Sequence, residues 1–324
     1  MSAPTARRPG PRWWWGRRSV VLALAVVGLV LPGCTTGADS SSVEPGFSST
    51  LPSSTPTSTT SDSSEPTAVP SPSASTPTDR PEPSGDRGPG PDGVTITAPP
   101  PGVAPVGPVV VLVHGGAWAG GSPSLLDGWA DALAAEGAVV FNASYALLAP
   151  PVGGYPSSVD DVACAVRFAR SEAPAYTDSD ELVLVGHSAG GHLGAVVALD
   201  PAPWGGDCAY PPAAGPDRLV GLAGIYDVKA ASVLQIIFTQ FVGASPTDEP
   251  ERWTAVNPVE LAERQNGLDV VLVIGSADNL VPPQQAQALQ AVLPDGAELV
   301  EIAGADHMEL QDPDVVGVDV VLGK

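Results

Sequence analysis

The stretch that decides the fold, ELVLVGHSAGGHLGA, occupies residues 181–195. Its first part, residues 181–185, is a predicted strand in which four apolar residues, 182–185, lead towards the serine. Residues 189–199 have the composition of a buried helix. Between the two lies Gly186-His187-Ser188-Ala189-Gly190, so the sequence predicts a sharp turn from strand to helix with a serine at its centre.

The two glycines of this turn remove a steric obstacle. A side chain two positions before or after Ser188 would clash, and Gly186 and Gly190 carry none. The strained backbone of such a turn holds the serine Oγ up at the edge of the sheet. A G-x-S-x-G pattern between a strand and a helix predicts a nucleophile, whereas a serine that only caps the helix is the alternative.

The same alternation of apolar runs and helical spacing extends to both sides of this stretch. It favours an α/β fold with a mostly parallel sheet and helices on both of its faces. In such sheets the functional residues follow the carboxyl ends of strands. The predicted strands are residues 109–113, 138–142, 181–185, 219–224, 270–274 and 297–302, and the predicted helices are 125–136, 157–173, 189–199 and 283–293.

Residues 227–261 interrupt the alternation. They contain a predicted short helix at 231–241 and a polar segment at 245–253. This insertion is either a short cap over the site or a plain excursion on the surface, and the sequence favours neither.

A glycine-rich turn follows the first predicted strand, at His114-Gly115-Gly116-Ala117-Trp118. The intermediate of acyl transfer carries a negative oxygen, which backbone N–H groups stabilise best where no side chain is in the way. We expect Ala189 N–H to be one donor of this oxyanion hole and the N–H of Gly116 or Ala117 to supply the others.

Together the two motifs resemble those of the α/β-hydrolase fold, in the esterase/lipase branch with an H-G-G-x-W oxyanion motif. That branch includes feruloyl/acetyl-xylan-type esterases and arylformamidases. Further stretches similar to it are PSSVDDVACAVRFAR (156–170), GIYD (224–227) and GSADNLVP (275–282). The resemblance covers roughly the chain from residue 109 onward and implies a hydrolase that requires no metal or organic cofactor.

A serine nucleophile needs a base, and the chain has four histidines. His114 begins the oxyanion turn and is expected to anchor it. His187 is adjacent to the serine, where side chains point apart, and His192 is expected to pack against its helix or to rim the pocket. His307 follows the last predicted strand, where the fold places its base, so His307 is the predicted base.

The acid that orients the base should lie between serine and histidine in the chain and should follow a strand. Asp278 meets both conditions. Asp227 also follows a strand, but the resemblance indicates a structural role for it, and Asp306 is too close to His307 in sequence to reach its ring easily. Ser188, His307 and Asp278 are therefore the predicted catalytic residues.

The resulting hypothesis is a serine carboxylesterase that hydrolyses small esters or acyl decorations of polysaccharide. The alternatives are an arylformamidase-like amide hydrolase and a surface-anchored protein that has kept the fold without activity. Trp118 and Tyr145 are expected to line the substrate pocket, although either could belong to the core. No long apolar lid is evident, which disfavours a lipase for long chains.

The N-terminus has the features of an export signal. Five arginines precede an apolar run at residues 20–31, which is shorter than the roughly 20 residues that a membrane-spanning helix needs. The run ends in Leu31-Pro32-Gly33-Cys34, which resembles the lipobox of bacterial lipoproteins. We expect residues 1–34 to be a lipoprotein signal with Cys34 lipidated, which would anchor an extracytoplasmic protein to the bacterial membrane; a plain secretory signal or an uncleaved anchor is the alternative.

Residues 35–92 are mostly Ser, Thr and Pro and predict a disordered linker. The hydrolase domain is expected at residues 93–324. Without residues 1–33 the chain keeps 9 basic and 36 acidic residues, a formal charge of 9 − 36 = −27, which disfavours nucleic acid as a partner. Cys164 and Cys208 are candidates for a disulfide, because exported proteins retain them, but two buried thiols remain the alternative.

Overall fold

The computed structural model describes residues 88–89, 93–148, 154–201, 203–230, 234–264, 267–294 and 296–324. The predicted signal segment at 1–34, its Cys34, and all of the predicted linker except residues 88–89 lie outside the described residues.

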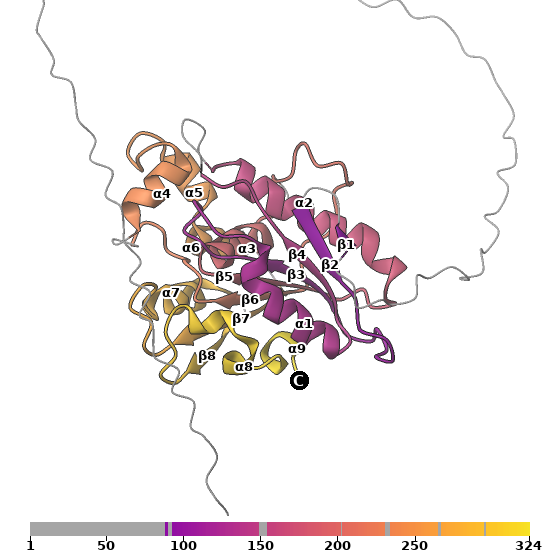
Figure 1. Ribbon diagram of the computed structural model, residues 1–324. Helices are drawn as coiled ribbons and strands as arrows, with labels where there is room; N and C mark the ends of the chain where they lie inside the picture. Colours follow the sequence, from indigo (N-terminus) through magenta and orange to yellow (C-terminus); the bar gives the residue numbers. More distant parts are fainter. Residues whose placement is uncertain are drawn as a thin grey trace, which may run out of the picture. The chain divides into compact units, whose positions relative to one another are not determined.

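An eight-stranded sheet forms the centre of the molecule, in the order β1-β2-β4-β3-β5-β6-β7-β8 (Figure 1). The strands from β4 to β8 in this order pair in parallel, whereas β1 and β2 pair antiparallel at one edge. The predicted mostly parallel sheet is confirmed. The strands are β1 Gly88–Pro89, β2 Val94–Thr97, β3 Val109–Val113, β4 Val139–Ala143, β5 Leu182–His187, β6 Arg218–Leu222, β7 Asp269–Gly275 and β8 Glu298–Ile302.

Helices cover both faces of this sheet, as predicted (Figure 1). One face packs against α2, α3, α7 and the insertion, and the opposite face packs against α1, α8 and α9. The helices are α1 Asp127–Ala135, α2 Ser157–Glu172, α3 Ala189–Leu199, α4 Gln235–Val242, α5 Pro250–Ala255, α6 Pro258–Leu261, α7 Gln284–Val292, α8 Pro313–Val316 and α9 Asp319–Leu322.

The strand β3 shows why a continuous apolar run forms here. Val109, Val111 and Val113 face the core shared with α2 and α3, while Val110 and Leu112 face the core shared with α1. Successive side chains of a strand point to opposite faces, so a strand covered on both sides needs apolar residues at every position. This burial holds the carboxyl ends of the central strands, where the candidate site lies, in a fixed register.

The structure corrects two expectations at the edge of the sheet. The antiparallel strand β2 is absent from the predicted strands, because it stands outside the repeated strand–helix pattern and is only 4 residues long. Residues 88–89, which the sequence places in a disordered linker, form β1 and pair with residues 95 and 96 of β2. Ordered pairing therefore begins before the predicted domain boundary at residue 93.

In its described residues, the insertion at 227–261 carries three short helices rather than one. The predicted helix at 231–241 begins later, because α4 runs from Gln235 to Val242, and residues 231–233 lie outside the described residues. Phe238 and Phe241 of α4 pack on the ring of Trp118, with centroids 5.1 and 5.4 Å away. The insertion therefore covers the turn that contains the predicted oxyanion donors and is not a plain surface excursion.

A disulfide joins Cys164 in α2 to Cys208 in the loop that follows α3. The two residues are 44 positions apart. In a chain-entropy model, a bridge that closes a loop of this length destabilises the unfolded chain by about 4 kcal/mol. The bridge thus ties the long loop between α3 and β6 to the helix that packs beside it.

Across the described ranges, none of the helices combines the length and the apolar character that crossing a bilayer requires.

Candidate active site

The turn between β5 and α3 presents Ser188. The strand ends at His187, the helix begins at Ala189, and Ser188 between them has φ 53° and ψ −117°. A residue with a side chain rarely adopts this conformation, which persists only where the surroundings enforce it. The fold thus uses conformational strain to hold this serine at the carboxyl end of the central strand.

The glycines of the turn are required by close backbone contacts. A Cβ on Gly186 would lie 2.3 Å from the carbonyl oxygen of Gly190. A Cβ on Gly190 would lie 2.2 Å from the carbonyl oxygen of Val113, at the end of β3. Neither contact leaves room for a side chain, so the sequence argument about these two glycines agrees with the packing.

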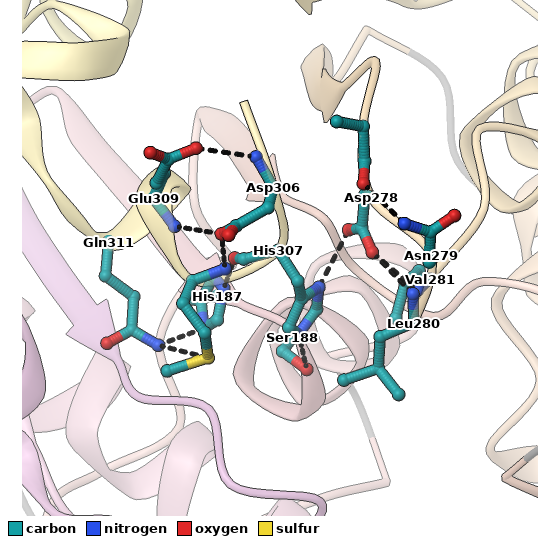
Figure 2. A network of polar contacts seen from close by, with 12 residues as sticks. His187, Ser188, Asp278, Asn279, Leu280, Val281, Asp306, His307, Glu309 and Gln311 are labelled. Carbon is teal, nitrogen blue, oxygen red and sulfur yellow. Dashed lines mark hydrogen bonds and ion pairs between the residues drawn. The ribbon is translucent and has the colours of Figure 1, made fainter. Parts of the chain in front are cut away.

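Three side chains that are far apart in sequence form a continuous chain of hydrogen bonds (Figure 2). The Nε2 atom of His307 lies 2.9 Å from Ser188 Oγ. Its Nδ1 atom lies 2.8 Å from Asp278 Oδ2. All three residues are buried, with exposed fractions of 6% for Ser188 and 7% for each of the other two. The arrangement orders a hydroxyl, an imidazole and a carboxylate so that a proton can move from the first to the second.

Each of these residues follows the carboxyl end of a parallel strand: Ser188 follows β5, Asp278 follows β7 and His307 follows β8. The two other aspartates that the sequence offered make local contacts instead. Asp227 Oδ1 accepts from the N–H groups of residues 229 and 230, and Asp306 Oδ1 accepts from those of residues 308 and 309.

The carboxylate of Asp278 is held in its charged form. Burial by itself would raise the pKa of this group, but a hydrogen bond from His307 and two backbone N–H groups outweigh burial, and the net pKa is lowered. The backbone donors are Leu280 and Val281, whose N–H groups lie 2.8 Å from Asp278 Oδ1. The two oxygens of the carboxylate therefore play different parts, since the backbone fixes Oδ1 while Oδ2 orients His307.

The turn after β3 has an unusual backbone. Gly116, Ala117 and Trp118 all have positive φ angles, of 133°, 52° and 58°. A Cβ on Gly116 would lie 2.0 Å from the carbonyl oxygen of Gly120, so only glycine fits there. The backbone N–H groups of Ala117 and Ala189 have no hydrogen-bond acceptor within the described part of the chain. Free N–H groups on this turn and at the start of α3 are what an oxyanion site needs.

The structure corrects the expectation that Trp118 and Tyr145 line a substrate pocket. Trp118 is fully buried, and its Nε1–H donates to His192 Nδ1 at 3.1 Å. Tyr145 is also buried; it stacks on the ring of His114 and donates its hydroxyl to the His114 carbonyl oxygen. Both residues support the turn from behind. A large aromatic residue near a motif gives no signal in the sequence that separates these two roles.

The exposed apolar side chains near the site were not found by sequence reasoning. Leu280 follows Asp278 and is 45% exposed, and Met308 follows His307 and is 58% exposed. Figure 2 shows Leu280 close to the side of the triad that Ser188 occupies. Their positions one residue after His307 and two residues after Asp278 were the only available signal.

Two further histidines are buried beside the nucleophile, and both are neutral. Burial lowers the pKa of His187 to about 4, and the nearby His307 contributes to the same shift. Burial likewise lowers the pKa of His192 to about 4. His192 Nε2–H donates to the Val256 carbonyl oxygen at 2.8 Å, so this imidazole connects Trp118 to the insertion.

These pKa values predict that acid destabilises the fold. Unfolded imidazoles titrate near 6.5, so between about pH 6.5 and 4 the unfolded chain binds more protons than the folded chain. The free energy of unfolding should fall through this window by about 3 kcal/mol for each histidine. Urea titrations at about pH 7 and pH 4.5 measure the loss. His187→Gln, which removes one titrating group, should lose less than the parent protein; equal losses would contradict the assignment.

Within the described residues, no group of three or more His, Cys, Asp or Glu side chains is arranged to hold a metal ion.

Comparisons with known proteins agree with this geometry. A family model described as BD-FAE matches residues 95–293, which is more than half of the chain. A search of curated protein sequences gives no match.

Solved structures with the same fold include several esterases. A truncated carbohydrate esterase from gut microbiota is 19% identical, with a TM-score of 0.59 over 70% of this chain and 88% of that one. Esterase B from Lactobacillus rhamnosis, solved with a tributyrin phosphonate, is 20% identical, with a TM-score of 0.57 over 67% and 73%. Est2 from the planctomycete Thermogutta terrifontis is 24% identical, with a TM-score of 0.53 over 66% and 77%. The chain belongs to the BD-FAE family and shares its α/β-hydrolase fold with these solved esterases.

Proposed function

We propose that Ser188, His307 and Asp278 are the nucleophile, the base and the orienting acid of an ester hydrolase. The observation that carries the proposal is the unbroken path from Ser188 Oγ through the imidazole of His307 to Asp278 Oδ2, with contacts of 2.9 and 2.8 Å. Asp278 fixes the tautomer in which Nδ1 carries the hydrogen, so that Nε2 offers its lone pair to the serine hydroxyl.

In the first step Ser188 Oγ attacks the ester carbonyl while His307 Nε2 takes its proton. The carbonyl oxygen becomes an anion, which the N–H groups of Ala189 and of Gly116 or Ala117 stabilise. The C–O bond to the alcohol then breaks, and His307 returns the proton to the leaving alkoxide. Water, activated by the same imidazole, releases the acid and restores the hydroxyl.

The substrate that we propose is a small ester or an acyl group attached to a polysaccharide. The exposed side chain of Leu280, which lies near Ser188 in Figure 2, supplies apolar surface beside the triad for a short acyl or alcohol group. The carbohydrate esterase from gut microbiota that shares the fold supports the second kind of substrate.

We also propose that the enzyme acts outside the cytoplasm, anchored through Cys34. The first support is the order of features in residues 1–34, where arginines are followed by an apolar run and then by Leu-Pro-Gly-Cys. The second is the disulfide between Cys164 and Cys208, because disulfides persist in oxidising compartments. Residues 35–87 would then separate the domain from the membrane. Metabolic labelling with a fatty-acid analogue tests the anchor, and loss of label in Cys34→Ala is the expected result.

The test of the reaction is a panel of p-nitrophenyl esters that varies the acyl length, with matched formyl and acetyl anilides. We expect the acetyl to butyryl esters to be hydrolysed fastest and the anilides at least about a hundredfold more slowly, because the nitrogen of an anilide must be protonated as it leaves, whereas p-nitrophenolate leaves readily as an anion. Faster turnover of the formyl anilide would favour the amide hydrolase instead. Folded protein that a fluorophosphonate does not label would favour an inactive hydrolase fold.

A further inference from the structure

The backbone of the proposed base is held by the residue next to the nucleophile. His187 Nε2 lies 2.9 Å from the carbonyl oxygen of His307. Within the described part of the chain, this carbonyl has no other hydrogen-bond donor. The rings of the two histidines also lie together, with centroids 4.8 Å apart. His187 therefore connects residues 188 and 307 by a second route, independent of the bond between their side chains.

The protonation of His187 follows from its partners. A carbonyl oxygen can only accept, so Nε2 of His187 must carry a hydrogen. Nδ1 of the neutral ring then has a lone pair, and the side-chain amide of Gln311 faces it with Nε2 at 3.2 Å. An amide N–H donates to that lone pair, which fixes this tautomer. Figure 2 shows Gln311 and His187 together on the side of His307 away from Asp278.

Neutrality of this ring matters for the reaction. His307 becomes positively charged when it takes the serine proton, and a second positive charge in the adjacent ring would oppose that step. Burial lowers the pKa of His187 to about 4, so the ring is uncharged at neutral pH. His187 can thus hold the base in place without repelling the imidazolium that forms.

We propose that His187, with its tautomer fixed by Gln311, is a positioning residue that holds the main chain of His307 so that His307 Nε2 stays in reach of Ser188 Oγ. The loop that carries His307 follows β8, which is the edge strand of the sheet and, among the described strands, pairs with β7 alone. The base therefore lies on a loop that the sheet supports from one side only. His187 is the last residue of the central strand β5, and its side chain binds the carbonyl oxygen of His307 in that loop. It therefore connects the loop to the centre of the sheet. This inference rests on the proposed function of Ser188 and His307.

The experiment compares His187→Leu, which removes the donor, with His187→Gln, whose amide N–H can reach the same carbonyl. We expect His187→Leu to lower kcat by about 30- to 100-fold with KM changed by less than about twofold, because a shift of the base slows the chemical step and leaves substrate binding intact. His187→Gln should recover kcat to within about fivefold of the parent enzyme. Counting active sites with a fluorophosphonate makes kcat independent of any unfolded fraction, and the labelling rate constant should fall with kcat.

Gln311 provides a variant that does not disturb the buried ring. Gln311→Ala should lower kcat by about 3- to 10-fold, whereas Gln290→Ala should leave it unchanged. Gln290, on helix α7, is the matched control. It is similarly half-buried, and its side-chain amide also donates to an acceptor, the backbone carbonyl of Ala297.

The outcomes separate this inference from the proposed function. A kcat per titrated site within about threefold of the parent in His187→Leu, or His187→Gln as slow as His187→Leu, would overturn the positioning role alone. Full activity in Ser188→Ala, measured in the same series, would overturn the proposed function and this inference with it. A lower melting temperature of His187→Leu with an unchanged kcat would show that His187 has a structural role only, and would also overturn the proposal.

Discussion

Ser188→Ala should lower kcat/KM for short p-nitrophenyl esters by about 10⁴- to 10⁶-fold. Without Oγ no acyl-enzyme can form, and His307 has no hydroxyl from which to take a proton. The N–H groups of Ala117 and Ala189 remain, so a small residual rate above that of water is expected. Initial rates at substrate concentrations well below KM measure the loss directly.

Alanine is the right replacement because it leaves the turn as it is. The residue at this position has φ 53°, which glycine would relax and alanine would keep. The only side-chain hydrogen bond of Ser188 among the described residues is the one to His307, so little stability should be lost. The matched control is Ser171→Ala, an exposed serine near the end of α2, which should have parental activity. Turnover by purified Ser188→Ala within about a hundredfold of the parent would refute the nucleophile.

The central strands and the helix after the nucleophile could be predicted closely from the sequence. The bounds of β3 and α3 agree with the prediction at both ends, because buried elements must be apolar throughout and the flanking glycines and prolines mark where they stop. Edge elements could not be predicted as well. Within the described ranges, the strand β2 pairs over its whole length only with β4. Its four residues are too few for an alternation of apolar and polar residues to predict a strand.

The chemistry of the site could be predicted where spacing along the chain determines it. Ser188, Asp278 and His307 each follow a strand of the parallel part of the sheet, and parallel strands end at the same edge. The contacts that support them depend on distances between residues far apart in sequence. Trp118 and His192 are 74 positions apart, and His187 contacts a carbonyl 120 positions away, so neither contact leaves a pattern that a single sequence can reveal.

Asp278→Asn should lower kcat by about 10³- to 10⁴-fold, and the reason lies in the environment of the carboxylate. Oδ1 accepts from the N–H groups of Leu280 and Val281, so the carbonyl oxygen of an asparagine would take that side. Its NH₂ group would then face His307 Nδ1, now 2.8 Å from Oδ2. A donor there selects the tautomer with hydrogen on Nε2, and that tautomer cannot accept the proton of Ser188. Steady-state kinetics on the same esters measure the loss, with KM little changed.

Asp306→Asn is the matched control for this prediction. Asp306 is adjacent to His307 in sequence and also accepts from two backbone N–H groups through Oδ1, which an asparagine oxygen can do equally well. Because its side chain orients the loop and not the imidazole, we expect kcat within about threefold of the parent enzyme. If Asp306→Asn proved the more damaging change, or if Asp278→Asn kept more than about a tenth of the parental kcat, the orienting acid would have to be assigned elsewhere. The two aspartates thus separate a carboxylate that sets the tautomer of the base from one that only shapes the loop carrying it.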